Sequence, residues 1–291
     1  MYQTFINGKW SEGNVGIFGA MDHSVWLGSS VFDGARSIAG NTPDLSLHLE
    51  RVRHSADKVG LDCPYTVPEM MSLVQEGIAR FPADAELYIR PLVFGTEGLL
   101  IPDATQSGFA LTLFDAPLPP FTGFAACLSA LQRPSPLMAV TDAKASSLYA
   151  NTTRVLRDAK ARGFDNAVVL DGQGQVAEFA TSNLFFVNQQ DEVITPIPNG
   201  TFLAGITRAR VIKLLMAAGV KVQERVVLPA DLEAAKEIFN TGNFGKVQPC
   251  IRYESRVLPI GAITKLAHEC YVAFMRGEKG VVGAESKACT A

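Results

Sequence analysis

A proline-rich segment near the middle of the chain places the strongest constraint on how this sequence can fold. Residues 115–123 (Asp-Ala-Pro-Leu-Pro-Pro-Phe-Thr-Gly) contain three prolines in nine positions. Proline has a fixed φ and no backbone N–H, so this segment can neither join the interior of a sheet nor extend a helix. We therefore expect residues 116–123 to link an N-terminal domain (1–115) to a C-terminal domain (124–280), which a loose tail (281–291) follows.

Hydrophobic patterning on both sides of this segment indicates a mixed α+β protein. Strand-like runs dominate, helical runs recur between them, and no short-period repeat is visible. In the N-terminal part we expect strands at 4–9, 87–95 and 109–115 and helices at 45–60 and 67–81. In the C-terminal part we expect helices at 152–162, 207–218 and 264–275, the second with Thr207 as its N-cap. Residues 167–176 predict two strands joined by a glycine-rich turn, with Glu178 at the end of the second strand.

The composition is that of a globular protein of enzyme size. With 291 residues, of which 47% are hydrophobic and 19% charged, the chain can bury a core large enough for two lobes. The formal net charge is -3 with acids and bases interspersed, which argues against nucleic-acid and anionic-membrane partners. The N-terminus lacks a signal-peptide pattern, and no apolar run reaches the roughly 18 residues of a membrane span. We therefore expect a cytoplasmic protein.

The cysteines and histidines predict neither a disulfide framework nor a metal site. The cysteines number five, which is odd, and they are scattered without a Cys-x-x-Cys pair. Such usage is typical of reduced thiols that serve in packing. The four histidines show no spacing of metal ligands, so we expect no bound metal.

One lysine has the surroundings that carbonyl chemistry requires. Lys144 is followed by Ala145, Ser146 and Ser147, which are small and uncharged. We expect these neighbours to leave the lysine desolvated. Burial disfavours the ammonium form of a lysine, and a neutral amine is what a Schiff base with a carbonyl compound requires. The alternative is a surface lysine whose stem lies on apolar surface while its ammonium reaches water.

Further segments give this lysine a context. In chain order they are Phe5–Trp10, Val31–Arg36, His48–Arg51, Tyr88–Pro91, the segment from Lys144 to Tyr149, Glu178–Val187 and Leu203–Arg208. Taken in this order they resemble the class IV (fold type IV) aminotransferases that use pyridoxal 5'-phosphate (PLP), and among them the branched-chain amino acid aminotransferases. The resemblance extends to about Arg276, and therefore covers nearly the whole chain.

The resemblance implies a fold and an assembly. The expected architecture has a smaller N-terminal α/β domain on the substrate side (1–115) and a larger, β-barrel-like C-terminal domain with helices that binds PLP (124–280). The cofactor is expected between the two lobes. The resemblance also implies a homodimer with both sites near the interface, and small-molecule partners, namely an amino donor and a 2-oxo acid.

Each polar group of PLP has a matching residue type in the resembling segments. Lys144 would form the aldimine with the aldehyde and later carry the proton between substrate and cofactor. Glu178 would keep the pyridine nitrogen protonated, and Tyr149 would donate a hydrogen bond to the phenolic oxygen. The alternatives are an exposed hairpin carboxylate for Glu178 and simple packing for Tyr149.

The phosphate of PLP requires a cation and hydrogen-bond donors. Arg51 would supply a bidentate cation, while Ile206 and Thr207 would present backbone N–H groups at a helix start. Arg51 could instead be a solvated residue of a charged helix. The other expected cofactor contacts are Asn183, Leu203, Gly205, Thr241, Gly242 and Asn243. The chain departs from the family at Asn243, where a second hydroxyl residue is more usual.

Substrate contacts are expected mainly on the N-terminal domain. Arg90 would bind the distant carboxylate of glutamate, and Phe32 would receive an aliphatic side chain. Arg36 and Arg90 could instead form structural ion pairs beneath the pocket. The full set of expected substrate contacts is Leu27, Phe32, Arg36, Tyr88, Arg90, Asn243 and Phe244.

Leu27 marks a second departure from the family. Branched-chain enzymes usually place a pocket tyrosine at this position, whereas this chain has a leucine with Trp26 beside it. The pocket would lose a hydroxyl and gain apolar surface. A bulkier or less polar amino donor could therefore be accepted.

These observations predict a PLP-dependent transaminase with a ping-pong reaction. It would move an amino group between an L-amino acid of the branched-chain type and a 2-oxo acid such as 2-oxoglutarate. Two alternatives of related chemistry stay open: an (R)-selective amine or D-amino acid transaminase, and a PLP-dependent lyase of the aminodeoxychorismate lyase type. A non-enzymatic protein that kept the fold would need an eroded site, whereas Lys144, Tyr149, Glu178 and Arg51 are all present.

Overall fold

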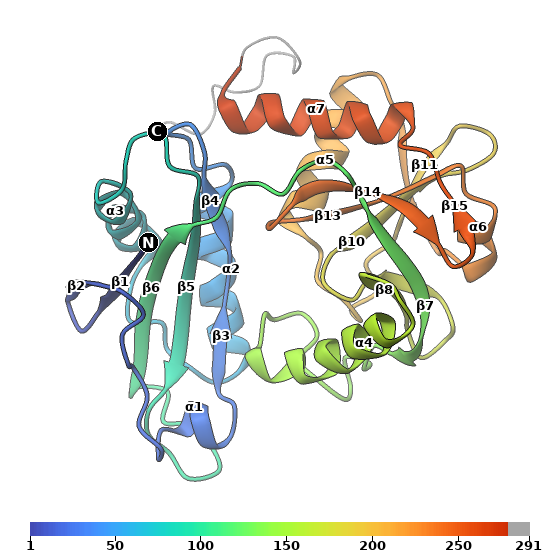
Figure 1. Cartoon of the computed structure of the whole chain (residues 1–291). Coiled ribbons are helices and arrows are strands. Elements are labelled where there is room, and N and C mark those ends of the chain that lie inside the picture. The colour runs from blue at the N-terminus through green and yellow to red at the C-terminus, as the bar shows by residue number, and fades with distance from the viewer. Residues whose placement is uncertain (279–291) are drawn as a thin grey trace. The chain divides into compact units, whose positions relative to one another are not determined.

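The protein, seen in a computed structural model that describes residues 1–278, divides into two compact units (Figure 1). Unit 1 is Met1–Leu118 with Pro136–Asn151, and unit 2 is Pro119–Ser135 with the chain from Thr152 onward. The chain thus leaves unit 1 inside the proline-rich segment. Residues 136–151, which carry Lys144, belong by their contacts to unit 1, although the sequence-based division places them in 124–280. The expected tail, 281–291, lies outside the described residues.

Unit 1 is built on a six-stranded antiparallel sheet. Its strands are β1 (Tyr2–Ile6), β2 (Lys9–Glu12), β3 (Ser30–Phe32), β4 (Ala35–Ser37), β5 (Leu87–Gly95) and β6 (Ser107–Asp115). They lie in the order β2-β1-β6-β5-β3, and β4 pairs with β5. A short helix, α1 (His23–Trp26), precedes β3.

Two helices, α2 (Leu45–Lys58) and α3 (Val67–Ile78), cover one face of this sheet (Figure 1). The core between them contains Leu49, Met70, Ile89, Val93, Leu111 and Leu113, all of which are fully buried. Because successive side chains of a strand point to opposite faces, Tyr88, Arg90 and Leu92 of β5 lie on the other face. The sheet therefore presents a face that α2 and α3 do not cover.

The expected strand at 4–9 is confirmed as far as Ile6, but its extension to Lys9 is wrong, because the chain makes a tight hairpin there. β1 ends at Ile6, β2 begins at Lys9, and Ile6 pairs with Lys9. The two turn residues, Asn7 and Gly8, have φ of 50° and 76°. Positive φ at both positions is the requirement of the two-residue hairpin turn that Asn-Gly favours.

Unit 2 is built on a nine-stranded mixed sheet with helices around it. Its strands are β7 (Phe124–Gln132), β8 (Asn166–Leu170), β9 (Val176–Phe179), β10 (Asn183–Val187), β11 (Val193–Pro196), β12 (Val222–Arg225), β13 (Glu237–Gly242), β14 (Lys246–Tyr253) and β15 (Arg256–Val257). Its helices are α5 (Ile206–Ala217), α6 (Pro229–Glu233) and α7 (Ala262–Arg276), while α4 (Tyr149–Ala161) begins in unit 1 after the 3-10 helix η1 (Ser146–Leu148). The mixed α+β expectation is confirmed.

The expected N-cap of α5 is wrong by two positions. Gly205 is the N-cap, with an extended backbone at φ -66° and ψ 136°, and the helix begins at Ile206. Thr207 lies inside the first turn with its side chain buried. A threonine before an apolar run is a common cap, but here the glycine is required by a close neighbour, Asn183, as the site geometry shows.

The described cysteines form no disulfides with one another. Cys63, Cys127, Cys250 and Cys270 are free thiols, and burial raises the pKa of Cys250 to about 12. Cys127, Cys250 and Cys270 are buried, as packing residues are, whereas Cys289 lies outside the described residues. Over residues 1–278, no helix has the length and apolar character needed to cross a bilayer, and no cluster of three or more His, Cys, Asp or Glu side chains could hold a metal ion.

Replacing Thr66 with Ala should lower the free energy of unfolding by about 1 kcal/mol. Thr66 caps α3 through a reciprocal pair of hydrogen bonds, in which its hydroxyl accepts from Glu69 N and Glu69 Oε2 accepts from Thr66 N at 2.7 Å. Urea denaturation would measure the change. The matched variant Glu69→Gln keeps an acceptor oxygen and should cost less, and equal stability of all three proteins would contradict the capping argument.

Candidate active site

The segment that carries Lys144 is held in unit 1 by backbone contacts. Ala145 forms an isolated antiparallel bridge with Val31, and Phe32 N donates to Lys144 O at 3.2 Å. Lys144 N donates to Ser55 Oγ on α2 at 3.0 Å. The segment is therefore fixed against β3 and α2, which explains why residues 136–151 belong to unit 1.

The side chain of Lys144 meets two aromatic rings. Its Nζ lies 2.5 Å from Tyr149 Oη and 4.7 Å from the ring centroid of Phe32, and the two rings are 5.0 Å apart. The expectation that small neighbours desolvate Lys144 is wrong, since the side chain is partly exposed. Ala145 lies in a backbone bridge and Ser146 in a 3-10 turn. Its environment is set by Tyr149 and Phe32, whose faces attract a cation.

Arg51 lies in a buried charge network and is not a solvated helix residue. Its Nε and Nη2 donate to Asp33 Oδ2 and Oδ1 at 2.7 and 2.9 Å, and His48 Nδ1 lies 2.8 Å from Asp33 Oδ1. Burial alone would raise the pKa of the Asp33 carboxyl, but the charge and hydrogen bonds of Arg51 and His48 hold it well below its usual range. Arg51 Nη1 is outside this bidentate contact, so the guanidinium retains donors for an anion.

In unit 2, Glu178 is positioned by two neighbours. Its Oε1 lies 3.5 Å from Nη1 of Arg133, and its Oε2 accepts from Asn183 Nδ2 at 3.2 Å. The side chains of Glu178 and Arg133 are 10% and 14% exposed, so the expected alternative of an exposed hairpin carboxylate does not apply. Sequence reasoning missed Arg133, because nothing in the pattern Gln-Arg-Pro at the end of β7 indicates which acid it reaches.

Asn183 links Glu178 to the start of α5. Its Nδ2 also donates to Leu203 O at 3.0 Å, and its Oδ1 lies against Gly205. A Cβ on Gly205 would lie 2.0 Å from that oxygen, so only glycine fits the N-cap. The first turn at Ile206 and Thr207 presents backbone N–H groups that have no partner within the helix. A helix start of this kind is suited to an anion.

The hairpin between β13 and β14 lies next to Asn183. Thr241 pairs with Asn183 in the sheet, its side chain is 1% exposed, and its Oγ1 has no hydrogen-bond partner among residues 1–278. Asn243 Oδ1 accepts from Nζ of Lys246 at 2.6 Å. Phe244 at the tip is 62% exposed. The expected residues Asn183, Leu203, Gly205, Thr241 and Gly242 are therefore gathered in one part of unit 2.

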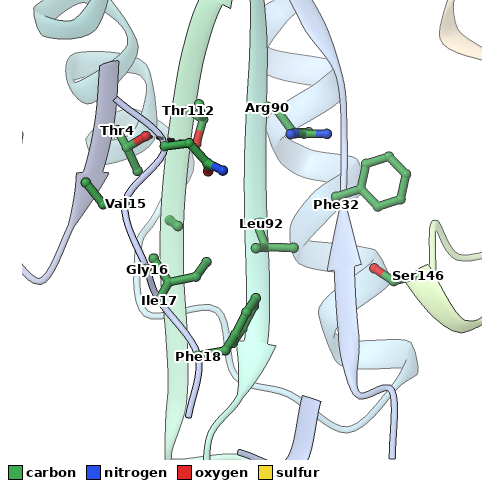
Figure 2. A pocket seen from close by; sticks show the side chains of 12 residues that line it. Thr4, Val15, Gly16, Ile17, Phe18, Phe32, Arg90, Leu92, Thr112 and Ser146 are labelled. Carbon is green, nitrogen blue, oxygen red and sulfur yellow. Dashed lines mark hydrogen bonds between the residues drawn. The ribbon is translucent and has the colours of Figure 1, made fainter. Parts of the chain in front are cut away.

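A cavity of about 580 Å³ lies on the face of the unit 1 sheet that the helices leave uncovered. Figure 2 shows Arg90 and Leu92 of β5 between Phe32 on one side and the segment Val15–Phe18 on the other. Thr4, Thr112 and Arg90 are cross-strand neighbours, so two hydroxyls lie in the same row as the guanidinium. Arg90 is exposed and forms no ion pair with any residue of the described chain. The cavity thus has an apolar side and one cation.

Other expected substrate residues do not line this cavity. Arg36 is fully buried and donates a hydrogen bond to Ala116 O. Its guanidinium carbon lies 5.6 Å from the ring centroid of Tyr88, so these contacts give Arg36 a structural role. Tyr88 in turn occupies the space above Gly34, where a Cβ would lie 2.0 Å from the phenol oxygen. Leu27 is 46% exposed at the C-cap of α1. Phe244 and Asn243 line a separate cavity in unit 2.

Replacing Asp33 with Asn should destabilise the protein in a pH-dependent way. Folding lowers the pKa of this carboxyl below its unfolded value of about 3.9, so its stabilisation is complete above that pH and is lost as the pH falls toward the folded-state pKa. We expect D33N to be about 3 kcal/mol less stable at pH 7, because Arg51 loses a buried partner. Urea unfolding from pH 7 to 2 would measure this, with the exposed Asp84→Asn as control. A difference that does not shrink at low pH would contradict the prediction.

Comparison with known proteins places this geometry in a family. Residues 30–253 match the family model for amino-transferase class IV. A probable branched-chain-amino-acid aminotransferase of Rickettsia bellii is 32% identical over 252 residues, which are 85% of this chain and 86% of the relative. A putative enzyme of the same name from Methanocaldococcus jannaschii is 31% identical over 274 residues, covering 91% of this chain and 93% of the relative.

Solved structures agree with this assignment. An aminotransferase from Brucella abortus, bound to the cofactor PLP, has a TM-score of 0.92 and 45% identity, covering 94% of this chain and 99% of that one. The branched-chain amino acid aminotransferase of Escherichia coli has a TM-score of 0.85 and 26% identity, with 98% and 96% covered. The fold type IV architecture expected from the sequence is confirmed. The chain belongs to the class IV aminotransferase family and is similar to its branched-chain members.

Proposed function

We propose that this protein, a PLP-dependent transaminase of class IV, moves an amino group between an L-amino acid of the branched-chain type and a 2-oxo acid such as 2-oxoglutarate. One observation carries the proposal. The Lys144 amine is in contact with the Tyr149 phenol and with Phe32. Phe32 also lines the cavity described above, in which Arg90 is the one cationic side chain among the lining residues of the described chain. An amine, a phenol and a side-chain pocket therefore lie together in unit 1.

The donor set of the structure fits PLP. The cofactor supplies a carbonyl carbon and a ring that accepts electrons when a bond to the substrate α-carbon breaks. Lys144 is the amine that would bond that carbonyl, and Arg51 is a cation with free donors for the phosphate. Within unit 2, the buried Thr241 hydroxyl, which has no hydrogen-bond partner among residues 1–278, and the first turn of α5 offer uncharged donors that suit a phosphate.

The proton transfers fall to Lys144 and Tyr149. With PLP and substrate bound, the Nζ of Lys144 would be the group that removes and carries the proton of the substrate α-carbon. The Tyr149 Oη lies 2.5 Å from Lys144 Nζ and accepts its hydrogen bond, which holds the amine in place. Its own O–H would donate to the phenolic oxygen of PLP. Glu178 would keep the pyridine nitrogen protonated. Arg133 and Asn183 fix its two carboxylate oxygens for this role.

The cavity beside Phe32 supports a substrate that alternates between an aliphatic and an acidic side chain. Leu92, Ile17 and Phe32 offer apolar surface to a branched chain, while Arg90 at the edge can bind the second carboxylate of glutamate. A ping-pong reaction needs one pocket to accept both.

We also propose that residues 1–115 are the substrate-side domain and 124–280 the PLP-binding domain, and that the protein works as a cytoplasmic homodimer.

Exposed apolar surface at Leu27 favours a second candidate. Leu27 and Trp26 are each 46% exposed, where branched-chain enzymes usually carry a tyrosine. An (R)-selective amine transaminase would use such a surface for a donor without a carboxylate. The exposed Arg90 argues against this candidate, because an amine gives it nothing to bind.

Borohydride reduction of the holoenzyme should attach the cofactor to Lys144. Peptide mapping by mass spectrometry would locate the label, and a label on Lys160, Lys213 or Lys246 would show that the assignment is wrong. Lys144→Ala should lose activity by several orders of magnitude, because one side chain supplies both the amine and the proton carrier. The exposed Lys213→Ala serves as the control and should keep wild-type activity.

Arg90→Ala should raise the KM for glutamate and 2-oxoglutarate far more than the KM for leucine, isoleucine or valine. The two effects should differ by about 1 kcal/mol or more, because only the acidic substrates lose a charged hydrogen bond. Arg80→Ala, an exposed arginine on the same unit, is the control. Equal effects on both substrate classes would remove Arg90 from the pocket.

Wild-type rates separate the two candidate functions. We expect leucine with 2-oxoglutarate to react faster than (R)-1-phenylethylamine with pyruvate, because Arg90 and the polar row beside it suit carboxylates. A faster amine rate would favour the amine transaminase, whatever the effect of Arg90→Ala.

A further inference from the structure

Lys246 is a lysine in a place where lysines are rarely found. It begins β14, opposite Gly242 of β13, and only 2% of its surface is exposed. Its backbone has a φ of 59°, in the left-handed region that most side chains avoid. Burying a long charged side chain and holding its backbone in this region both cost free energy. Features of this kind persist where the surrounding structure uses them.

The ammonium of Lys246 fixes the side chain of Asn243. Nζ donates to Asn243 Oδ1 at 2.6 Å and lies 5.4 Å from the ring centroid of Tyr271 on α7. Because Nζ donates to Oδ1, the amide of Asn243 turns its oxygen toward Lys246. The NH2 edge of the amide, whose nitrogen is buried, is then directed away from Lys246.

Asparagine at position 243 needs such a partner, whereas a hydroxyl does not. The hydroxyl residue that is more usual in the family rotates freely and can donate or accept as required. An amide has a donor edge and an acceptor edge that cannot exchange without a flip of the whole group. A chain with asparagine at this position therefore gains a defined donor only if something holds the oxygen.

We infer that Lys246 is a positioning residue that orients Asn243 so that the hairpin 241–245 donates hydrogen bonds to the phosphate of the cofactor. The inference rests on the proposed use of PLP. A second observation supports it independently: Thr241, in the same hairpin, has a hydroxyl that is buried and has no partner among residues 1–278. A buried hydroxyl without a protein partner is explained when an oxygen of a bound ligand accepts its hydrogen bond.

Position in the sheet connects this hairpin to the anion-binding helix start. Thr241 pairs with Asn183, and Asn183 Oδ1 lies against Gly205 at the N-cap of α5. Phosphate has enough acceptor oxygens for the first turn of α5 and for the hairpin together. The substrate carboxylate is the other anion that the hairpin could hold, so the test must distinguish the two.

The decisive comparison is the affinity of the apoenzyme for PLP and for pyridoxal, which lacks the phosphate. Wild type, Lys246→Met, Asn243→Thr and the double variant would be titrated with each by absorbance and fluorescence. Lys246→Met should weaken PLP binding roughly tenfold, the scale for one hydrogen bond to a charged group, and leave pyridoxal binding unchanged. In the Asn243→Thr background the same substitution should change PLP binding less than about twofold, since a hydroxyl needs no orienting partner.

Three outcomes would overturn the inference. Equal weakening for PLP and pyridoxal would give Lys246 a merely structural role, and equal weakening in both backgrounds would separate it from Asn243. An unchanged PLP affinity with a raised KM for the amino donor would assign the hairpin to the substrate carboxylate. The exposed Lys265→Met is the control for loss of a charge, and it should leave PLP affinity unchanged.

A further variant keeps the test valid if Lys246→Met does not fold. Asn243→Asp keeps the size of the side chain and its oxygen for Lys246 but removes the NH2 donor, so it should weaken PLP by at least tenfold and spare pyridoxal. Unchanged PLP affinity in Asn243→Asp would contradict the inference. Failure of the wild-type protein to attach PLP at Lys144 would instead contradict the proposed function, so the two failures are distinguishable.

Discussion

The buried carboxylate of Asp33 connects the β3–β4 junction to α2, the parts of unit 1 against which the Lys144 segment lies. It accepts hydrogen bonds from Arg51 and Gly34 N and contacts His48, so it ties the β3–β4 junction to α2. Phe32 is the residue immediately before Asp33, and its backbone N–H donates to Lys144 O. A charge this deeply buried is tolerated only with such partners. The position of Lys144 therefore depends on an ion pair that does not contact it.

In unit 2 the structure positions uncharged hydrogen-bond donors and one acid, Glu178. Asn183 is central to it, because its amide nitrogen contacts both Glu178 and Leu203 O while its oxygen limits position 205 to glycine. The same residue pairs with Thr241 in the sheet. One asparagine thus fixes the acid, the helix start and the hairpin relative to one another. Arg133 and Lys246 then hold the side chains of Glu178 and Asn243.

The sequence pointed more readily to residues proposed to contact the cofactor or substrate than to residues that position them. Lys144, Glu178 and Arg51 stand in segments that resemble a known family, and each is the residue type that the chemistry demands. Asp33, Arg133 and Lys246 were not given these roles, because an ion pair or hydrogen bond across the fold leaves no periodic signal in the chain. Arg36 shows the converse: its position resembled a substrate contact, but its guanidinium is buried and bound to Ala116 O.

The sequence by itself determined most of the element types and the interruption at residues 115–123, since hydrophobic period, proline and glycine act locally. It also supplied the residues proposed for the chemistry. Only the tertiary structure decided that residues 136–151 belong with unit 1, that aromatic rings and not small neighbours surround the Lys144 amine, and that Gly205 rather than Thr207 caps α5. Each of these depends on a contact between residues far apart in the chain. Such contacts are selected by packing and hydrogen bonding in the folded state, where local preference is only one contribution.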